Sequence, residues 1–243
     1  MNGDFRNGYS RKESTRDVYI ILHLLRKKTP FAYARFNDGE MIAIVNRRGI
    51  IARGDQVITP QLADGLTLSL LHEQENYWKG LICGSCFPDL HPMALKLVGN
   101  YPYLLSAVAL VNRNWRTFIL ECPKYLQDRN IVWIGGEDQN TDNLSACPGI
   151  KIQKAFRFKN KNTWDCYGDL KDLASEFHEG DLVFISLGPV SRILAQQWFS
   201  LLPRTTFIDI GSVFDPFTRD VWHPYHRGWH TGFNAERRCP SCN

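Results

Sequence analysis

Two carboxylates separated by one glycine, Asp38-Gly39-Glu40, stand directly after a short apolar segment at 31–36. An apolar run from Met41 to Val45 follows, so the pattern predicts a strand that passes through an acidic turn into a helix. Ligands of open α/β sheets bind at the carboxyl ends of the strands. Neighbouring carboxylates repel each other and favour a cation, a hydroxyl-rich ligand or hydrogen-bond donors beside them. The alternative is an acidic turn in solvent.

Glycines, often with acidic residues, also follow later apolar segments, and parallel strands would bring these positions to the same edge. The residues are Gly135, Gly136, Gly188, Pro189, Asp209, Gly211 and Ser212. Glycine lets a ligand approach the backbone, and a helix that starts after Gly188 would offer free N–H groups to a phosphate. The dinucleotide fingerprint and the P-loop motif are both missing from the sequence, which argues against NAD dehydrogenases and P-loop NTPases.

Apolar periodicity predicts alternating helices and strands along the chain. The expected strands are 31–36, 80–84, 131–136, 151–156, 181–187 and 205–211, and the expected helices are 14–28 with Ser14 as N-cap, 41–46, 59–75, 93–110, 115–127, 164–177 and 190–202. Continuous apolar strands separated by helices indicate parallel pairing. We therefore expect an α/β fold, a Rossmann-like and mostly parallel sheet flanked by helices, with an irregular C-terminal tail.

Length and composition indicate one globular unit. The 243 residues are 44% hydrophobic and 22% charged, and we expect a single domain over 1–243 with a loose lead at 1–13 and a tail or lid at 212–243. The net charge of +4 suits an anionic ligand or nucleic acid. No apolar run approaches the roughly 18 residues that span a bilayer, and the N-terminus lacks an apolar signal region, so we expect a cytoplasmic protein.

Two further groups of residues have both a binding and a structural interpretation. His226 and Arg227 lie in an aromatic tail and could clamp a diphosphate, or the tail could pack only for structure. Of seven cysteines, four form two C-x-x-C pairs, Cys83 with Cys86 and Cys239 with Cys242. Together they could form a tetrahedral zinc site. The alternative places Cys83 at the end of a buried strand and leaves the terminal pair unligated.

Carboxylates and phosphates share a site when a divalent cation bridges them. Mg²⁺ and Mn²⁺ prefer oxygen ligands, often one or two carboxylates together with substrate phosphate. Such a metal would stabilise a leaving diphosphate as a Lewis acid. This chemistry fits group transfer from a nucleoside diphosphate.

Two blocks of the sequence resemble the GT-D-type glycosyltransferases. Ala34-Arg-Phe-Asn-Asp-Gly-Glu40 is similar to that family's R-[YFI]-x-D-G-E segment, and Ile185 to Gly211 resembles its later strand–helix–strand. The resemblance spans roughly residues 14 to 217. It implies a Rossmann-like enzyme of the hexosyltransferase kind that transfers a sugar from a UDP-sugar, with Arg35, Asp38, Gly39 and Glu40 on the donor side. The resemblance also implies that Asp38 and Glu40 are the ligands of the Mn²⁺ or Mg²⁺ ion and bind the nucleotide diphosphate through it.

The chain departs from the family pattern on the acceptor side, where Ser212 stands in place of a histidine. Asp215 is the candidate general base for the acceptor hydroxyl, and an Asp-Pro turn is the structural alternative. The acceptor would be a glycan or glycoconjugate, or a hydroxylated base in DNA. A non-catalytic nucleotide-sugar or nucleic-acid binding module is the rival from another class. A Rossmann-like methyltransferase is disfavoured because no glycine-rich loop follows the first strand.

Overall fold

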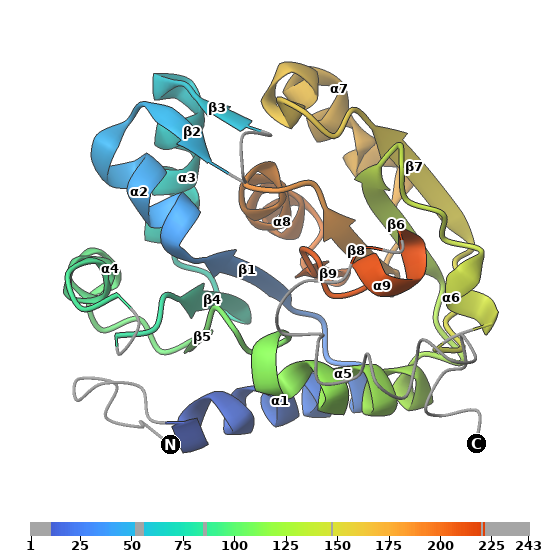
Figure 1. The fold of residues 1–243 in the computed structure, drawn as a ribbon. Coiled ribbons are helices and arrows are strands. Elements are labelled where there is room, and N and C mark those ends of the chain that lie inside the picture. Colours follow the sequence, from blue (N-terminus) through green and yellow to red (C-terminus); the bar gives the residue numbers. More distant parts are fainter. Residues whose placement is uncertain (1–10, 52–55, 85–86, 147, 220, 222–243) are drawn as a thin grey trace.

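A seven-stranded parallel sheet forms the centre of the molecule (Figure 1). The computed structural model describes residues 11–51, 56–84, 87–146, 148–219 and 221. The strands of the sheet are β1 (Ala32–Phe36), β4 (Tyr77–Leu81), β5 (Leu104–Ser106), β6 (Ile131–Gly136), β7 (Lys154–Phe158), β8 (Leu182–Ser186) and β9 (Thr206–Asp209). Their order is β5-β4-β1-β9-β8-β6-β7, and every neighbouring pair is parallel. The predicted α/β class with a parallel sheet is confirmed.

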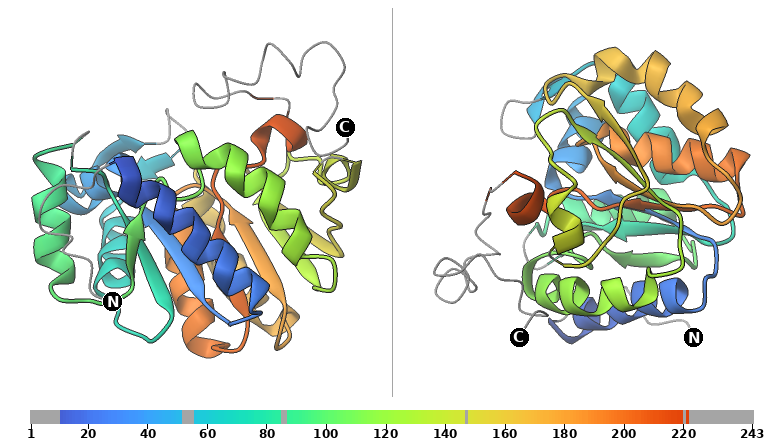
Figure 2. Two further views of the ribbon diagram at one scale, coloured as in Figure 1. Left: turned by 90° about the horizontal axis from the view of Figure 1, so that it is seen from below. Right: turned by 90° about the vertical axis from the view of Figure 1, so that its right-hand side faces the viewer.

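Helices cover both faces of this sheet (Figures 1 and 2). One face carries α2 (Asp38–Asn46), α3 (Pro60–Leu71), α7 (Tyr167–Asp172) and α8 (Val190–Leu201), and the opposite face carries α1 (Arg11–Arg26) and α5 (Trp115–Glu121). The shorter helices α6 (Asn143–Ala146) and α9 (Asp215–Thr218) lie side by side near one end of the sheet, and α4 (Leu90–Val98) packs into the core on the α2 side. No helix within the described ranges is both long enough and apolar enough to cross a membrane.

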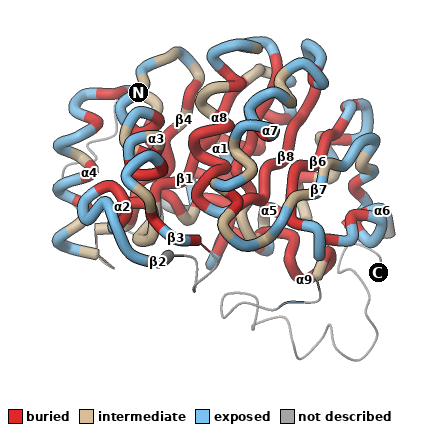
Figure 3. Tube along the Cα trace, turned by 90° about the horizontal axis from the view of Figure 1, so that it is seen from above, coloured by how far each residue is buried: buried red, intermediate tan, exposed pale blue. Residues whose placement is uncertain are grey.

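Strand β8 shows why the sheet is buried on both sides. Val183 and Ile185 pack into the core beneath α8, while Leu182 and Phe184 pack into the core beneath α1 and α5. Side chains of a strand alternate between its two faces, so a strand covered on both faces is apolar throughout. In Figure 3, where the chain trace is coloured by burial, the strands at the centre of the molecule have the colour of buried residues.

The order of the strands reverses its direction at the middle of the sheet, between β1 and β9. We call the carboxyl ends of these two strands the ligand edge. β1 and β9 are neighbours, although β1 is the first and β9 the last strand of the sheet along the chain. The chain leaves β1 toward β4 on one side and reaches β9 from β8 on the other side. Such a reversal of direction is the point at which open α/β sheets bind ligands.

Three predicted segments differ in the structure. The first helix begins at Arg11, so Ser14 lies inside it and is not its N-cap. The predicted helix 93–110 is two elements, α4 and the short strand β5, because Gly99 adopts a positive φ of 59° and ends α4. The segment between the helix 41–46 and the helix that starts at 59, for which the sequence predicted no strand, contains β2 (Gly49–Ile51), which pairs with β3 (Gln56–Ile58) as a hairpin.

Three other boundaries also differ. The helix predicted over 59–75 ends at Leu71, and the helix predicted over 164–177 is α7 between two 3₁₀ turns, Thr163–Cys166 and Leu173–Glu176. The helix predicted over 115–127 is α5 followed by the 3₁₀ turn Cys122–Tyr125, and another 3₁₀ turn, Asn112–Asn114, precedes it.

Candidate functional site

The acidic segment forms the first turn of α2 at the carboxyl end of β1. Asn37 is the N-cap, and the Oε2 atom of Glu40 accepts a hydrogen bond from the Asn37 backbone N–H at 3.1 Å. Asp38 is half-buried beside it, where the helix dipole favours a negative charge. The predicted turn is therefore the start of a helix, and it separates the two carboxylates: Glu40 points back into the protein and Asp38 stays accessible.

Arg192 of α8 joins the ends of β1, β9 and α2 through a buried ion-pair network. Its Nη2 atom lies 3.2 Å from Oε1 of Glu40, and its Nε atom lies 3.1 Å from Oδ2 of Asp209. The same Nε also donates to the backbone oxygen of Arg35 at 2.6 Å. The Asp209 side chain is fully buried. A buried carboxylate is stable only with charged or hydrogen-bonding partners, which the two arginines supply here.

Arg35 completes this network from β1. Its backbone N–H and its Nε atom lie 3.2 Å and 3.4 Å from Oδ2 of Asp209. Gly211 follows β9 with a φ of +49°, and a Cβ atom at this position would lie 1.7 Å from Nη2 of Arg35. Glycine is therefore needed at position 211 because any larger side chain would collide with the guanidinium group of Arg35. Arg35, Asp209 and Gly211, which the sequence predicted at one edge, do lie together.

A second group of polar side chains fills the space over Gly135 and Gly136. A Cβ atom on Gly135 would lie 2.0 Å from Oε1 of Gln139, and one on Gly136 would lie 1.7 Å from Oδ1 of Asn160. Gln139 also donates to Ser186 Oγ at 2.9 Å. The sequence predicted that a ligand lies next to these glycines. In the structure, the side chains of Gln139 and Asn160 occupy that space.

The loop before α8 carries Gly188 and Pro189 at the same edge. Gly188 is exposed with a φ of +57°, and its carbonyl oxygen accepts a hydrogen bond from Nη1 of Arg192. Leu187 N–H donates to Ser191 Oγ at 2.9 Å, which fixes the first turn of α8. The start of α8 is therefore tied to the same arginine that holds Glu40 and Asp209.

The acceptor-side residues lie after β9. Ser212 begins the turn that leads into α9, and Asp215 is the first residue of that helix. The Asp215 side chain is buried, and Arg219 Nε lies 3.8 Å from its Oδ1 and 3.1 Å from Oδ1 of Asp138. Arg219 thus links α9 to the segment that follows β6.

Several predicted site residues fall beyond what the structure describes. These are His226, Arg227, Cys86, Cys239 and Cys242. Cys83 is described and half-buried, and it follows β4 in a loop, because the strand ends at Leu81. The zinc site and the diphosphate clamp stay predictions.

The donor set around α2 fits a divalent cation held mainly by one protein carboxylate. Both oxygens of Glu40 already have partners, whereas Asp38 forms no ion pair with any described residue and is half-buried. In the described part of the chain, no cluster of three or more histidine, cysteine, aspartate or glutamate side chains could enclose a metal ion. Mg²⁺ and Mn²⁺ are commonly bound by one or two carboxylates with substrate phosphates, so such a partial set is sufficient.

Sequence reasoning missed Arg192, Gln139 and Ser186. A signal was present for Arg192, which interrupts the apolar residues Val190, Ile193 and Leu194 on a helix that otherwise packs inward. A lone arginine in such a segment indicates a buried ion pair when acidic residues stand at neighbouring strand ends.

Comparison with known proteins shows likeness at the level of the fold. No protein-family model and no curated protein matches the sequence. Among solved structures, a selenomethionine-substituted structure of domain of unknown function 1792 (DUF1792) superposes with a TM-score of 0.64 at 13% identity, covering 90% of this chain and 84% of that chain.

Two further structures of the same domain are similar. One is described as having a distinct glycosyltransferase fold, with a TM-score of 0.62, 13% identity and the same coverage of 90% and 84%. The other, a new glycosyltransferase (DUF1792) from Streptococcus sanguinis, has a TM-score of 0.60 and 16% identity, covering 88% of this chain and 83% of that chain. The class that the fold defines is therefore an α/β protein with this glycosyltransferase fold.

Proposed function

We propose that the protein is a glycosyltransferase that moves a sugar from a nucleotide-sugar donor, a UDP-sugar, to an acceptor hydroxyl. The observation that carries the proposal is the accessible carboxylate of Asp38 on the first turn of α2, at the central ligand edge of the sheet. Likeness to solved proteins of a glycosyltransferase fold supports the same reading. The segment around Asp38 also carries the resemblance to GT-D-type enzymes.

On the donor side, Asp38 is the protein ligand of a Mg²⁺ or Mn²⁺ ion that also binds the diphosphate. When bound, the ion stabilises the negative charge of the departing diphosphate. Glu40 closes the turn that presents Asp38, and Arg192 holds Glu40 in that conformation. Gly39 lies between the two carboxylates and is half-buried. The exposed Gly188 and the start of α8 form the opposite side of the diphosphate site.

On the acceptor side, Asp215 is the proposed general base. The acceptor oxygen attacks the anomeric carbon, its proton passes to the Asp215 carboxylate, and the bond from that carbon to the diphosphate oxygen breaks. Arg219 lies beside Asp215 and orients the start of α9 through Asp138. The acceptor is a glycan or glycoconjugate hydroxyl.

A nucleotide-sugar screen tests the proposal. Thermal unfolding is measured with UDP-, GDP- and ADP-sugars, each with and without Mn²⁺, and release of the nucleoside diphosphate is then followed for the donor that stabilises most. We expect a UDP-sugar to raise the midpoint in a Mn²⁺-dependent way and to be turned over. Binding without turnover in the presence of candidate acceptors would identify a binding module and contradict the enzyme. A salt-dependent gel shift with duplex DNA identifies a DNA acceptor.

A further inference from the structure

The side of α1 that faces away from the sheet is basic and aromatic. Its other side, with Val18, Ile21 and Leu25, is buried in the core, which fixes the direction in which the helix faces. Exposed side chains recur at helical spacing on the outward side and on the residue that follows the helix: Arg16, Tyr19, His23, Arg26 and Lys27. Tyr19 is 55% exposed, so a large aromatic ring lies in water among these cations.

Helix α5 lies beside α1 on the same side of the sheet and extends this surface (Figures 1 and 2). We call the surface formed by the following residues the basic face: Arg16, Tyr19, His23, Arg26, Lys27, Arg116 and Lys124. Among the side chains that the structure describes on both helices and on the connection to β6, the accessible acidic ones are Glu121 and Asp128. Glu121 is already paired with Lys124 at 2.7 Å. The basic face therefore has an excess of positive charge.

Partly exposed apolar side chains lie beside these cations. Ile20 and Leu24 on α1 and Leu120 on α5 are each half-buried. Surfaces that bind at the level of lipid headgroups combine basic residues with apolar and aromatic side chains, and tyrosine is enriched there. The major groove of B-DNA admits one helix, whereas two helices lie side by side here. Composition and shape thus favour a lipid surface over nucleic acid.

From these observations we propose that the basic face docks on an anionic membrane surface. Arg16, Arg26 and Lys27 are attracted by the negative headgroups, and this attraction acts over about a Debye length. Their methylene stems lie along the apolar side chains while the charged ends stay in the headgroup layer. The ring of Tyr19 enters the same layer. A neutral bilayer lacks the complementary charge, so the partner is a membrane that contains anionic lipid.

The basic face also adjoins the acceptor side of the proposed transferase site. Trp115, the first residue of α5, donates from Nε1 to the backbone oxygen of Val213 at 2.7 Å, and its ring stacks on Phe217 with the ring centres 6.3 Å apart. These contacts fix α9, which begins at Asp215, to the end of α5. An acceptor carried by the membrane would reach Asp215 from this side. That consequence rests on the proposed function, whereas docking itself does not.

Co-sedimentation of the full chain with lipid vesicles tests the proposal. Vesicles of phosphatidylcholine alone are compared with vesicles that also contain about 30% phosphatidylglycerol, at low and at high salt. We expect binding to the anionic vesicles only, and weaker binding at high salt because ions screen the attraction. Tyr19→Gln should weaken binding several-fold and leave the salt dependence unchanged, since it removes apolar contact but no charge.

A triple variant with Arg16→Gln, Arg26→Gln and Lys27→Gln tests which surface binds. All three positions are exposed, and glutamine is compatible with a helix, so the variant should keep its fold. Each basic residue near an anionic surface typically contributes a factor of about 5, so binding should fall by at least about 30-fold. Circular dichroism confirms that the variant is folded.

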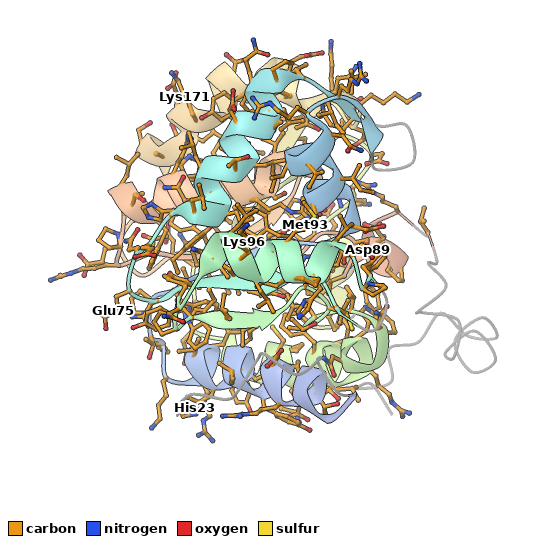
Figure 4. The ribbon with its side chains drawn as sticks, turned by 90° about the vertical axis from the view of Figure 1, so that its left-hand side faces the viewer. His23, Glu75, Asp89, Met93, Lys96 and Lys171 are labelled. Carbon is orange, nitrogen blue, oxygen red and sulfur yellow. The ribbon has the colours of Figure 1, made fainter. Side chains whose placement is uncertain are left out.

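The matched control removes the same charge from other parts of the surface. It combines Lys96→Gln, Lys159→Gln and Lys171→Gln, all at exposed positions. Figure 4 shows Lys96 on α4 and Lys171 well away from the α1 layer that carries His23. The control should bind anionic vesicles like the wild type, because only the position of the lost charges differs between the two variants.

Several results would overturn the proposal. Wild-type protein that does not bind anionic vesicles, or that binds neutral vesicles equally well, contradicts it, and so does a folded triple variant that binds like the wild type. Duplex DNA that displaces the vesicles at the same salt would assign the basic face to nucleic acid. A dimer in light scattering that the triple variant dissociates would assign it to a second copy of the chain. Turnover of UDP-sugar is measured separately without lipid, so a failure of docking and a failure of the proposed function are distinguishable.

Discussion

The Nη2 atom of Arg192 lies 3.2 Å from Oε1 of Glu40, and the two side chains are only 6% and 9% exposed. This contact joins α8 to the first turn of α2, while Nε of the same arginine pairs with Asp209 at the end of β9. Three elements that are distant in the sequence thus meet at one guanidinium. In this arrangement Glu40 holds the turn in place, and Asp38 stays accessible at its surface.

Removal of Glu40 should lower stability far more than removal of Asp38. Glu40→Ala leaves Arg192 without one of its buried partners and removes the acceptor of the backbone N–H of Asn37. Loss of one member of a buried ion pair costs about 3 kcal/mol or more. Asp38→Asn, at a half-buried position, should change the free energy of unfolding by about 1 kcal/mol or less. Urea denaturation of both variants measures the difference, and equal losses would contradict the division of roles.

Gly211→Ala should destabilise the protein through Arg35. The new methyl group would meet the guanidinium at 1.7 Å, and the φ of +49° is unfavourable for alanine. Overpacking of this kind typically costs about 1–3 kcal/mol. Gly168→Ala is the matched control, because Gly168 lies in α7 with open space around it, and alanine there should stabilise by about 0.5–1 kcal/mol. A loss in the control as large as that in Gly211→Ala would show that the contact with Arg35 is not the cause.

Lys79→Met should stabilise the protein at neutral pH but not at high pH. Lys79 is fully buried in β4 with its Nζ atom 3.7 Å from the ring centre of Tyr101, and burial lowers its pKa from 10.5 to about 8. Between these values the unfolded chain binds more protons than the folded chain, so wild-type stability rises with pH across this window.

The methionine variant lacks this titration, so its advantage over wild type is largest below pH 8 and disappears above pH 10.5. A shift of this size corresponds to about 3 kcal/mol at most. Urea denaturation of both proteins at intervals from pH 7 to pH 10.5 measures the gap. A gap that stays constant or widens as the pH rises would contradict the assignment to Lys79.

The sequence predicts those parts of the fold in which local pattern and burial agree. The central strands 131–136 and 181–187 are continuous apolar runs, and both are strands of the parallel sheet. Strand β5 and the hairpin strands β2 and β3 have three residues each, which is too short for a periodic pattern to appear. Their pairing depends on neighbours that are distant in the sequence.

Only part of the candidate site can be predicted from the sequence, because its contacts also depend on residues that are distant along the chain. The pattern brings Arg35, Asp209 and Gly211 to one edge, because the carboxyl ends of parallel strands meet there. The pattern does not reveal that Gly211 makes room for a guanidinium, or that Arg192 reaches across from α8. These relationships depend on side-chain directions in three dimensions, which residue spacing alone does not specify.

The most direct test of the proposed glycosyltransferase is the release of UDP from a UDP-sugar by wild type and by Asp38→Asn, both shown to be folded, with Mn²⁺ and an acceptor present. Asp64→Asn, on α3, is the matched control for the loss of one exposed acidic charge. We predict turnover by wild type and the control, and a loss of at least about 100-fold in Asp38→Asn, comparable to the removal of one stabilising group. Full activity of Asp38→Asn would contradict the role of this carboxylate, and no turnover by wild type with any nucleotide sugar would contradict the enzyme itself.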